Sequence, residues 1–327
     1  MKGVAVLVAA KLAVHLVAIR GYGLHGDELY YLACADHLDM GYVDHPPLAV
    51  WILAGVREIL GSSAPALRAV PVLTGAATVW LAGRMARELG GGGFAATLAA
   101  AAVLVSGVHL AIHGIYSVNA FDLLFWAVGQ LLVIRLARDD TSRRWAALGL
   151  VVGLGLLTKL SMAWFALGLG AGVLLTPARR WLRRPAPWAA AGLALLLVSP
   201  YLAWQVQHGW PTLAWFARHD ALVTDGSLAG FLGNQILAVH PLNFPIWVAG
   251  LAALLAAPGL RRFRVLGVQA AVVLAFLAWR APAVVHYPAA VYPVLFAAGA
   301  WVLERATAAG WRRRLLRPAG LGLLLLA

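Results

Sequence analysis

Two short motifs near the N-terminus carry side chains that could do chemistry. The first is Gly26-Asp27-Glu28-Leu29-Tyr30-Tyr31 and the second is Asp44-His45-Pro46-Pro47-Leu48. Asp27 could act as a general base, a task that suits a positioned carboxylate, although both carboxylates could instead stabilise a helix N-terminus. His45 could bind a phosphate, a carboxylate or a metal ion, or it could lie at a helix start beside Asp44. Tyr30 and Tyr31 fit either a site or an aromatic belt at a membrane interface.

Other polar residues that could complete a site fall on later segments of the chain. Asp122 follows Asn119 by three residues, so the two can share a helix face, although an N-cap network would explain them as well. Lys159 and Arg280 could bind a phosphate group through charge-assisted hydrogen bonds. Alternatively, both side chains extend to lipid headgroups. The pair His286-Tyr287 follows Arg280 closely and adds to a polar cluster.

The composition is that of a membrane protein. Of the 327 residues, 62% are hydrophobic and 12% are charged, whereas a soluble domain carries about 25% charged residues. The net charge of +13 would suit nucleic acid, but the Lys and Arg residues form short clusters between apolar runs. Such clusters are typical of the cytoplasmic loops of membrane proteins. Cys34 is the single cysteine, which excludes an intrachain disulfide.

Apolar runs divide the chain into about 11 candidate membrane spans. They cover residues 3–19, 65–83, 93–112, 119–137, 145–158, 161–177, 187–206, 240–257, 265–279, 286–303 and 316 to the end. The fold class is therefore expected to be all-α, a polytopic membrane protein. In the first outer loop, residues 20–64, the segments 27–38 and 48–60 are predicted to form amphipathic helices along the membrane interface. Residues 207–239 form a second outer segment, and the short spans that meet at 157–161 predict a broken or re-entrant pair.

Charged residues divide the connections between these spans into two classes. Arginine clusters follow the even-numbered spans, at residues 84–87, 135–144, 179–184, 261–264 and 305–317, whereas most acidic residues follow the odd-numbered spans. The positive-inside rule then predicts a cytoplasmic N-terminus and a first loop that faces outward. The polar face that could carry chemistry is thus expected outside the cytoplasmic membrane. Because the sequence ends inside an apolar run, residues 321–327, we also expect the chain to be a fragment.

Taken together, these motifs resemble those of the GT-C integral-membrane glycosyltransferases, in particular glycosyltransferase family 39 in its bacterial branch. That branch includes protein O-mannosyltransferases and the aminoarabinose transferases that modify lipid A. The resemblance covers almost the whole chain. Beyond the two N-terminal motifs, it is carried by Tyr116-Ser117-Val118-Asn119-Ala120-Phe121-Asp122, Leu157-Thr158-Lys159, Gln207-His208-Gly209-Trp210-Pro211, His286-Tyr287-Pro288 and Tyr292-Pro293.

The resemblance implies one GT-C transmembrane domain over residues 1–327. It also implies transfer of a sugar from a polyprenyl-phosphate donor to an acceptor hydroxyl on the outer face of the bacterial inner membrane. By position in the family motif, Asp27 is the catalytic carboxylate and Glu28 is its neighbour in the site. Lipid A-modifying relatives have an Arg in place of Tyr30 and a Lys in place of His45. The remaining candidates are expected to bind substrate or donor: Tyr30, Tyr31, Asp44, His45, Asp122, Lys159, Arg280, His286 and Tyr287.

The expected partners are the lipid-linked donor, a lipid, glycan or protein acceptor, and membrane lipids, without nucleic acid. No cofactor is assigned and a divalent metal ion stays open, since the sequence has no His-Glu-x-x-His spacing and no phosphate-binding glycine loop. The C-terminal extramembrane domain that is common in the family is expected to be absent from this chain. The alternative function is a multispanning transporter or flippase of a lipid-linked or anionic substrate. Inverted repeats would favour that alternative, and the sequence contains none that we detect.

Overall fold

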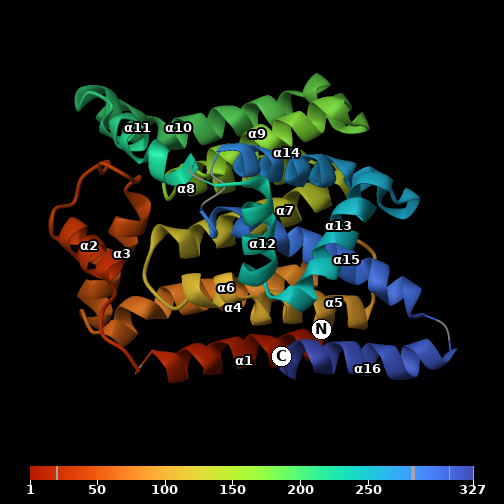
Figure 1. The fold of residues 1–327 in the computed structure, drawn as a ribbon. Helices are drawn as coiled ribbons and strands as arrows, with labels where there is room; N and C mark the ends of the chain where they lie inside the picture. Colours follow the sequence, from red (N-terminus) through yellow and green to blue (C-terminus); the bar gives the residue numbers. More distant parts are fainter. Residues whose placement is uncertain (20, 225, 281–283, 309, 327) are drawn as a thin grey trace.

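The computed structural model describes residues 1–19, 21–224, 226–280, 284–308 and 310–326, and these are helical with no strand (Figure 1). Residues 20 and 225 of the predicted outer segments, and residue 327 of the last predicted span, lie outside the described residues. The α-helices are α1 (Lys2–Ala18), α2 (Gly26–Asp36), α3 (Leu48–Leu60), α4 (Ala64–Glu88), α5 (Gly93–Val105), α6 (Gly107–Ile112), α7 (Val118–Arg138), α8 (Ser142–Leu156), α9 (Met162–Leu175), α10 (Pro185–Gln207), α11 (Pro211–Thr224), α12 (Leu228–Ala238), α13 (Phe244–Ala256), α14 (Arg264–Arg280), α15 (Tyr292–Ala306) and α16 (Gly310–Leu326). Short 3₁₀ helices connect some of them: η1 (Pro177–Arg183), η2 (Pro241–Asn243), η3 (Pro258–Phe263) and η4 (Tyr287–Val291).

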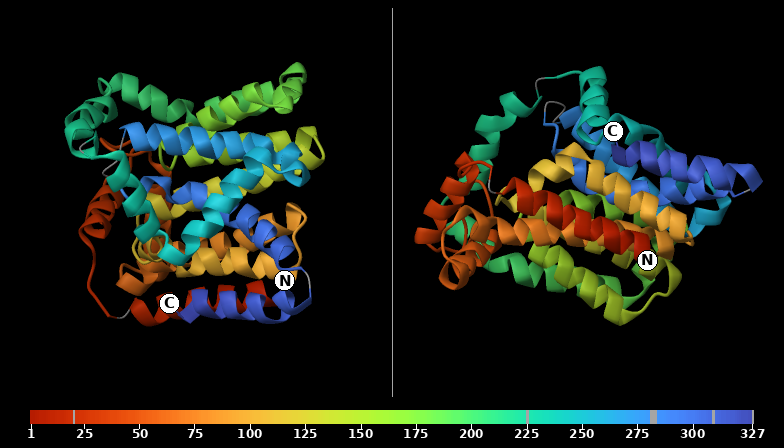
Figure 2. Two further views of the ribbon diagram at one scale, coloured as in Figure 1. Left: turned by 45° about the vertical axis from the view of Figure 1, so that its right-hand side comes forward. Right: turned by 90° about the horizontal axis from the view of Figure 1, so that it is seen from below.

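The long helices lie side by side in a bundle, and α2, α3 and α11 gather at one end of it (Figure 2). Five helical segments among the described residues are long and apolar enough to cross a membrane, and two bent pairs would raise the number to seven. The five are Ala64–Glu88, Val118–Arg138, Pro185–Gln207, Pro258–Arg280 and Tyr287–Ala306. The chain is thus an all-α, multi-pass membrane protein, as predicted. Each candidate span from the sequence coincides with helix, while their predicted number, about 11, stays a prediction.

Local sequence explains where the helices of the first outer loop begin. The side chain of His25 accepts a hydrogen bond from the N–H of Asp27, and the Glu28 carboxylate accepts one from the N–H of His25, which caps α2 at its start. Helix α3 begins at Leu48, directly after two prolines, where the missing N–H of proline is tolerated. Both helices predicted in this loop are therefore present, and the first ends at residue 36 rather than 38.

The predicted span over residues 93–112 is not one continuous helix. The sequence predicts a single span over residues 93–112, but the chain breaks at Ser106 into α5 and α6. Ser106 has an extended backbone (φ −67°, ψ 115°), and its hydroxyl lies 2.8 Å from Nδ1 of His109. Local side-chain hydrogen bonds of this kind compete with the helical hydrogen-bond ladder. A turn at residues 157–161 connects α8 to α9, and the broken or re-entrant pair expected there stays a prediction.

Close packing of α13 on α15 places the segment that begins with η4 against the bundle. A Cβ atom at Gly299 would lie 1.9 Å from the carbonyl oxygen of Ile246, and one at Gly250 would lie 2.0 Å from that of Leu295. Only glycine fits at such contacts, and small residues commonly allow membrane helices to approach in this way. The packing fixes the start of α15, where η4 carries the candidate residue Tyr287.

The arginine clusters gather at the end of the bundle opposite α2 and α3 (Figure 1). Glu88, at the end of α4, forms ion pairs with Arg84 at 3.2 Å, with Arg135 at 3.4 Å and with Arg138. Arg184 pairs with the carboxylate of Asp140 at 2.8 Å, which joins η1 to the loop after α7. We call this the basic end and the opposite end, with α2 and α3, the loop end. The separation of the two ends agrees with the alternation of charge along the sequence.

Candidate active site

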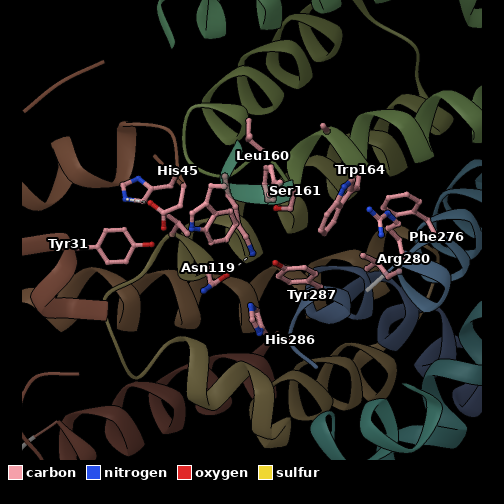
Figure 3. A pocket seen from close by; sticks show the side chains of 17 residues that line it. Tyr31, His45, Asn119, Leu160, Ser161, Trp164, Phe276, Arg280, His286 and Tyr287 are labelled. Atoms are coloured by element: carbon pink, nitrogen blue, oxygen red, sulfur yellow. Dashed lines mark hydrogen bonds and ion pairs between the residues drawn. The ribbon is translucent and has the colours of Figure 1, made fainter. Parts of the chain in front are cut away.

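A cavity of about 500 Å³ lies at the loop end of the bundle (Figure 3). Its wall combines the first outer loop, the start of α7, the turn between α8 and α9, α11, the end of α14 and the segment that leads into η4. Most of the predicted site residues line it: Tyr31, Asp44, His45, Lys159, Arg280, His286 and Tyr287. Segments that are far apart in the sequence therefore meet at one cavity, as their shared placement on outer loops predicts.

The first outer loop supplies one side of the cavity through a packed group of aromatic rings. The ring of His45 lies 5.0 Å from that of Tyr31 and 4.9 Å from that of Tyr42, between centroids. The Tyr30 hydroxyl donates to the Asp44 carboxylate at 2.5 Å. Burial and this hydrogen bond raise the pKa of Tyr30, so the phenol stays protonated and remains a donor. Tyr30 is not among the lining residues; it positions Asp44, which is.

His45 is buried, and its environment disfavours the charged form. Burial lowers the pKa of His45, although the Pro46 carbonyl and the Asp44 carboxylate act in the opposite direction. The Nδ1 atom lies 3.0 Å from the Pro46 carbonyl oxygen, and Nε2 has no hydrogen-bond partner among the described residues. A neutral imidazole at this position can exchange a hydrogen bond with a ligand in the cavity but does not supply a fixed positive charge.

Lys159 enters the cavity from the turn between α8 and α9. Its ammonium nitrogen lies 2.6 Å from Oδ1 of Asn119, 3.7 Å from Oδ2 of Asp122 and 5.1 Å from the centroid of the Tyr287 ring. Asp122 is itself buried and is not among the lining residues. The carboxylate thus lies behind Lys159 and fixes a cation in the cavity wall, which is a positioning role rather than a direct contact with a ligand.

The far side of the cavity carries Arg280 together with aromatic and aliphatic surface. Figure 3 shows Arg280 beside Phe276 at the end opposite Tyr31 and His45, with His286 and Tyr287 between them. Loss of contact with water, and then the charge of Lys159, lower the pKa of His286 to about 4. Its imidazole is therefore neutral at physiological pH. The cavity offers two fixed cations against a wall that is otherwise mainly apolar.

The neighbouring carboxylates of the first motif have different environments. Glu28 is fully buried and accepts hydrogen bonds from Arg68 at 2.8 Å and 2.6 Å, and from the N–H groups of His25 and Tyr116. Burial alone would raise the pKa of Glu28, but the hydrogen bonds from Arg68, His25 and Tyr116 outweigh it and hold the pKa below its usual value. The Glu28 carboxylate is thus engaged in contacts within the protein.

Asp27 lies one turn before Tyr31 on α2 and is not itself among the residues that line the cavity. Its side chain is 57% exposed, and its Oδ1 atom lies 3.8 Å from Nδ1 of His25. Burial and, to a smaller extent, the charges of Asp44 and Asp27 raise the pKa of Tyr31. The structure therefore places Asp44 in the cavity wall and Asp27 one helical turn from the lining residue Tyr31.

Arg68 and the aromatic wall are parts of the site that sequence reasoning missed. Arg68 reads in the sequence as one of several scattered cations, yet it is fully buried against Glu28. Its place within an apolar helix is the signal that could have found it. Trp164 and Phe276 lie within apolar runs, where a cavity residue looks the same as a core residue. Among the described residues, no group of three His, Cys, Asp or Glu side chains is arranged to hold a metal ion.

Comparison with known proteins agrees with this architecture. Residues 44–204 match the family model described as dolichyl-phosphate-mannose-protein mannosyltransferase. The lipid A galacturonosyltransferase RgtD from Rhizobium johnstonii is 27% identical over 227 residues, which cover 67% of this chain and 47% of that protein. The undecaprenyl phosphate-alpha-4-amino-4-deoxy-L-arabinose arabinosyl transferase of Pseudomonas aeruginosa is 31% identical over 166 residues, covering 49% of this chain and 30% of that protein. The chain thus spans less than half the length of these two relatives.

The fold also matches a solved structure over nearly its whole length. The crystal structure of ArnT from Cupriavidus metallidurans bound to undecaprenyl phosphate matches with a TM-score of 0.78 and 20% sequence identity. The match covers 97% of this chain and 62% of that one. The family-model match, the two sequence relatives and the shared helical fold thus make this chain similar to the GT-C integral-membrane glycosyltransferases that its motifs resemble.

Proposed function

We propose that this chain transfers a sugar from a polyprenyl-phosphate-linked donor to an acceptor hydroxyl. It would then act as a member of the bacterial branch of glycosyltransferase family 39. The observation that carries the proposal is the loop-end cavity, which Lys159, Arg280 and the carboxylate of Asp44 line together with a mainly apolar wall. An anionic phosphate on an apolar chain is the ligand that such a wall suits. The crystal structure of ArnT, which shares the fold, holds undecaprenyl phosphate, and both sequence relatives are named as glycosyl-transferring enzymes.

In the proposed reaction the acceptor oxygen attacks the anomeric carbon of the sugar. Asp27 takes the proton of the acceptor hydroxyl as the new C–O bond forms. The bond between the anomeric carbon and the donor's phosphate oxygen breaks, and its electron pair stays on the phosphate. Lys159 and Arg280 stabilise the negative charge that grows there, in a site already organised for it. The acceptor is a lipid, glycan or protein, and the cavity geometry does not distinguish among these classes.

Asp27 is a better candidate for the base than Asp44. The Asp44 carboxylate already accepts the Tyr30 hydroxyl, whereas no hydrogen bond to the Asp27 carboxylate occurs within the part of the chain that the structure describes. Because the Asp27 side chain is 57% exposed, its carboxylate can meet an acceptor that approaches from the aqueous phase. We assign Asp44 and His45 to orienting the sugar, and Glu28 to holding α2 in place.

We further propose that the cavity faces outward from the cytoplasmic membrane and that both the N-terminus and the basic end are cytoplasmic. The support is the collection of the arginine clusters at one end of the bundle (Figure 1), opposite the acidic first loop. Positively charged loops are retained on the cytoplasmic side during insertion. A donor that is presented on the outer surface would then reach the cavity directly.

The experiment that tests this function is sugar transfer by purified protein with an Asp27→Asn variant. Loss of a general base should lower kcat by about 10²–10⁴-fold while donor binding is retained. Glu58→Gln, which removes an exposed carboxylate from α3, is the matched control and should leave kcat within about twofold of wild type. Near-normal turnover by a well-folded Asp27→Asn protein would rule out Asp27 as the base. If Asp44→Asn then showed the large loss instead, the base would be Asp44.

A further inference from the structure

A second site, which the proposed reaction does not use, lies at the basic end around η1. A pocket of about 330 Å³ opens between η1 and η3, and arginines dominate its wall: Arg180, Arg261, Arg262 and Arg264. No carboxylate is among its described lining residues. An adjoining pocket adds Arg179 and Arg183 from η1. The segments η1 and η3 lie at the opposite end of the bundle from α2 and α3 (Figure 1), so these pockets are distant from the candidate active site.

The four arginines of this pocket differ from several other arginines of the basic end in having no acidic partner among the described residues. Nearby arginines pair with Glu88, Asp139 or Asp140 within 4.0 Å. Within the described residues, none of the four pocket arginines has such a partner. Arg262 lies over the ring of Phe263, and the buried Nε atom of Arg264 has no hydrogen-bond partner among the described residues. A concentration of guanidinium groups without acids is a site for an anion, because their planar donors match phosphate oxygens.

An apolar groove of about 350 Å³ adjoins the same 3₁₀ helix. It runs between α8, α9 and α10, and leucine, alanine and tryptophan side chains form most of its wall. Trp181 lines both the basic pocket and the groove, and its buried indole N–H has no hydrogen-bond partner among the described residues. Gly170 lies in the groove wall, and a Cβ atom there would meet nothing within 4 Å. The groove is thus open space directly beside a concentrated positive charge.

We propose that η1 anchors an anionic phospholipid, whose phosphate binds the arginines of the pocket and whose acyl chain lies in the groove. The two halves of the site match the two halves of such a lipid. Basic pockets between membrane helices on the cytoplasmic side commonly bind acidic headgroups. A zwitterionic lipid fits the groove equally well but does not supply the net negative charge that the unpaired arginines require.

The headgroup half of the site is tested by counting lipids retained on the delipidated, purified full chain by native mass spectrometry. The probes are dioleoylphosphatidylglycerol, dioleoylphosphatidylcholine and, as the free-anion arm, water-soluble glycerophosphoglycerol. The wild type should retain phosphatidylglycerol preferentially, and Arg180→Gln/Arg261→Gln should weaken that binding by about tenfold. Arg143→Gln is the matched control, because it removes an exposed charge that lies at the same end of the bundle but outside the pocket. It should change phosphatidylglycerol binding by less than about twofold.

The acyl half of the site is tested with Gly170→Leu, which fills the groove without a backbone clash. It should weaken phosphatidylglycerol binding, whereas Gly192→Leu, at an equally open glycine outside the groove, should not. Equal retention of the two phospholipids, or phosphatidylglycerol binding that Arg180→Gln/Arg261→Gln leaves unchanged, would overturn the proposal. Binding of glycerophosphoglycerol as tight as that of the whole lipid would show a free-phosphate site and would equally overturn it. A thermal melt of each variant confirms that the protein is folded.

Discussion

Lys159 and Arg280 are the residues on which donor recognition depends in this account. Lys159 is held by Asn119 and Asp122, so its charge is fixed in the wall by contacts that form before any ligand arrives. Arg280 lies at the end of α14 on the far side of the same cavity. A phosphate bound between them would meet a point charge on one side and a planar fork of donors on the other.

The role of Arg280 in donor binding can be tested by substitution. Arg280→Ala should weaken donor binding by about tenfold or more, the value of a charged hydrogen bond, and Arg280→Lys should restore only part of it, because Lys lacks the bidentate geometry. The measurement is a donor titration on purified protein, with Arg143→Ala as the charge-matched control at the other end. Equal donor affinity in wild type, Arg280→Ala and Arg280→Lys would remove Arg280 from the site.

The adjacent carboxylates Asp27 and Glu28 illustrate what sequence can and cannot predict at the scale of residues. The motif correctly marks the loop that lies against the cavity, because acidic and aromatic residues beside apolar spans are uncommon. The two acids look equivalent in the sequence, yet one is exposed and the other is enclosed by Arg68. The ion pair joins Glu28 to Arg68, which lies 40 positions away in the sequence, and no local sequence pattern indicates such a distant contact.

At the scale of elements, the Glu28–Arg68 ion pair ties α2 to α4. Arg68 also donates to the carbonyl oxygen of Gly23 at 2.7 Å, and Glu28 accepts from the N–H of Tyr116 just before α7. One buried pair therefore connects the first loop to two helices of the bundle. The position of α2, and with it the position of Asp27 and Tyr31 at the cavity, rests on this contact.

Glu28→Gln should destabilise the protein at pH 7, by on the order of 3 kcal/mol, because Arg68 is left buried without a countercharge. In the wild type the folded-state pKa of Glu28 lies below the usual value of 4.5. The stabilisation is therefore fully present above about pH 4.5 and is lost as the pH falls through the lower, folded pKa. Thermal melts in detergent from pH 7 to pH 3.5 should show this acid-side loss in the wild type and a shallower one in Glu28→Gln.

Glu58→Gln, at an exposed position on α3, should melt like the wild type at each pH. A Glu28→Gln protein as stable as the wild type at pH 7 would contradict the structural role. If it also lost sugar transfer, Glu28 would belong to the chemistry.

The helices can be predicted closely from the sequence, whereas the breaks within them cannot. Apolar runs and proline positions predict the helices of the bundle and the start of α3. The break at Ser106 escapes prediction because residues on both sides are equally apolar, and the local hydrogen bond to His109 is visible only in three dimensions. The cavity escapes prediction for a similar reason, since Trp164 and Phe276 have the composition of the core.

At the scale of the whole molecule, the two ends of the bundle carry different tasks. The loop end holds the cavity, and the basic end holds the arginines and the proposed lipid anchor. The alternation of charge predicts this separation because each span reverses the direction of the chain, so clusters that follow every second span meet at one end. Which end faces the cytoplasm is a proposal that rests on the positive-inside rule.

Paired cysteine variants test the orientation in intact cells. After Cys34→Ser removes the native thiol, Ser62→Cys beside α3 should react with a membrane-impermeant thiol reagent, because the loop end is expected to face outward. Ser142→Cys at the basic end should react only after lysis. Both serines are exposed, so a reversed pattern would invert the orientation, and with it the side from which the donor arrives.

The central claim is that the loop-end cavity binds a polyprenyl phosphate, and photocrosslinking tests it most directly. A polyprenyl phosphate with a diazirine beside the phosphate should label peptides that line the cavity, such as those with Trp164 and Phe276, and unlabelled undecaprenyl phosphate should suppress that labelling. Mass spectrometry of the digested protein identifies the sites. Labelling confined to the basic-end groove around Trp188, or labelling of the cavity that the unlabelled lipid fails to suppress, would contradict the claim.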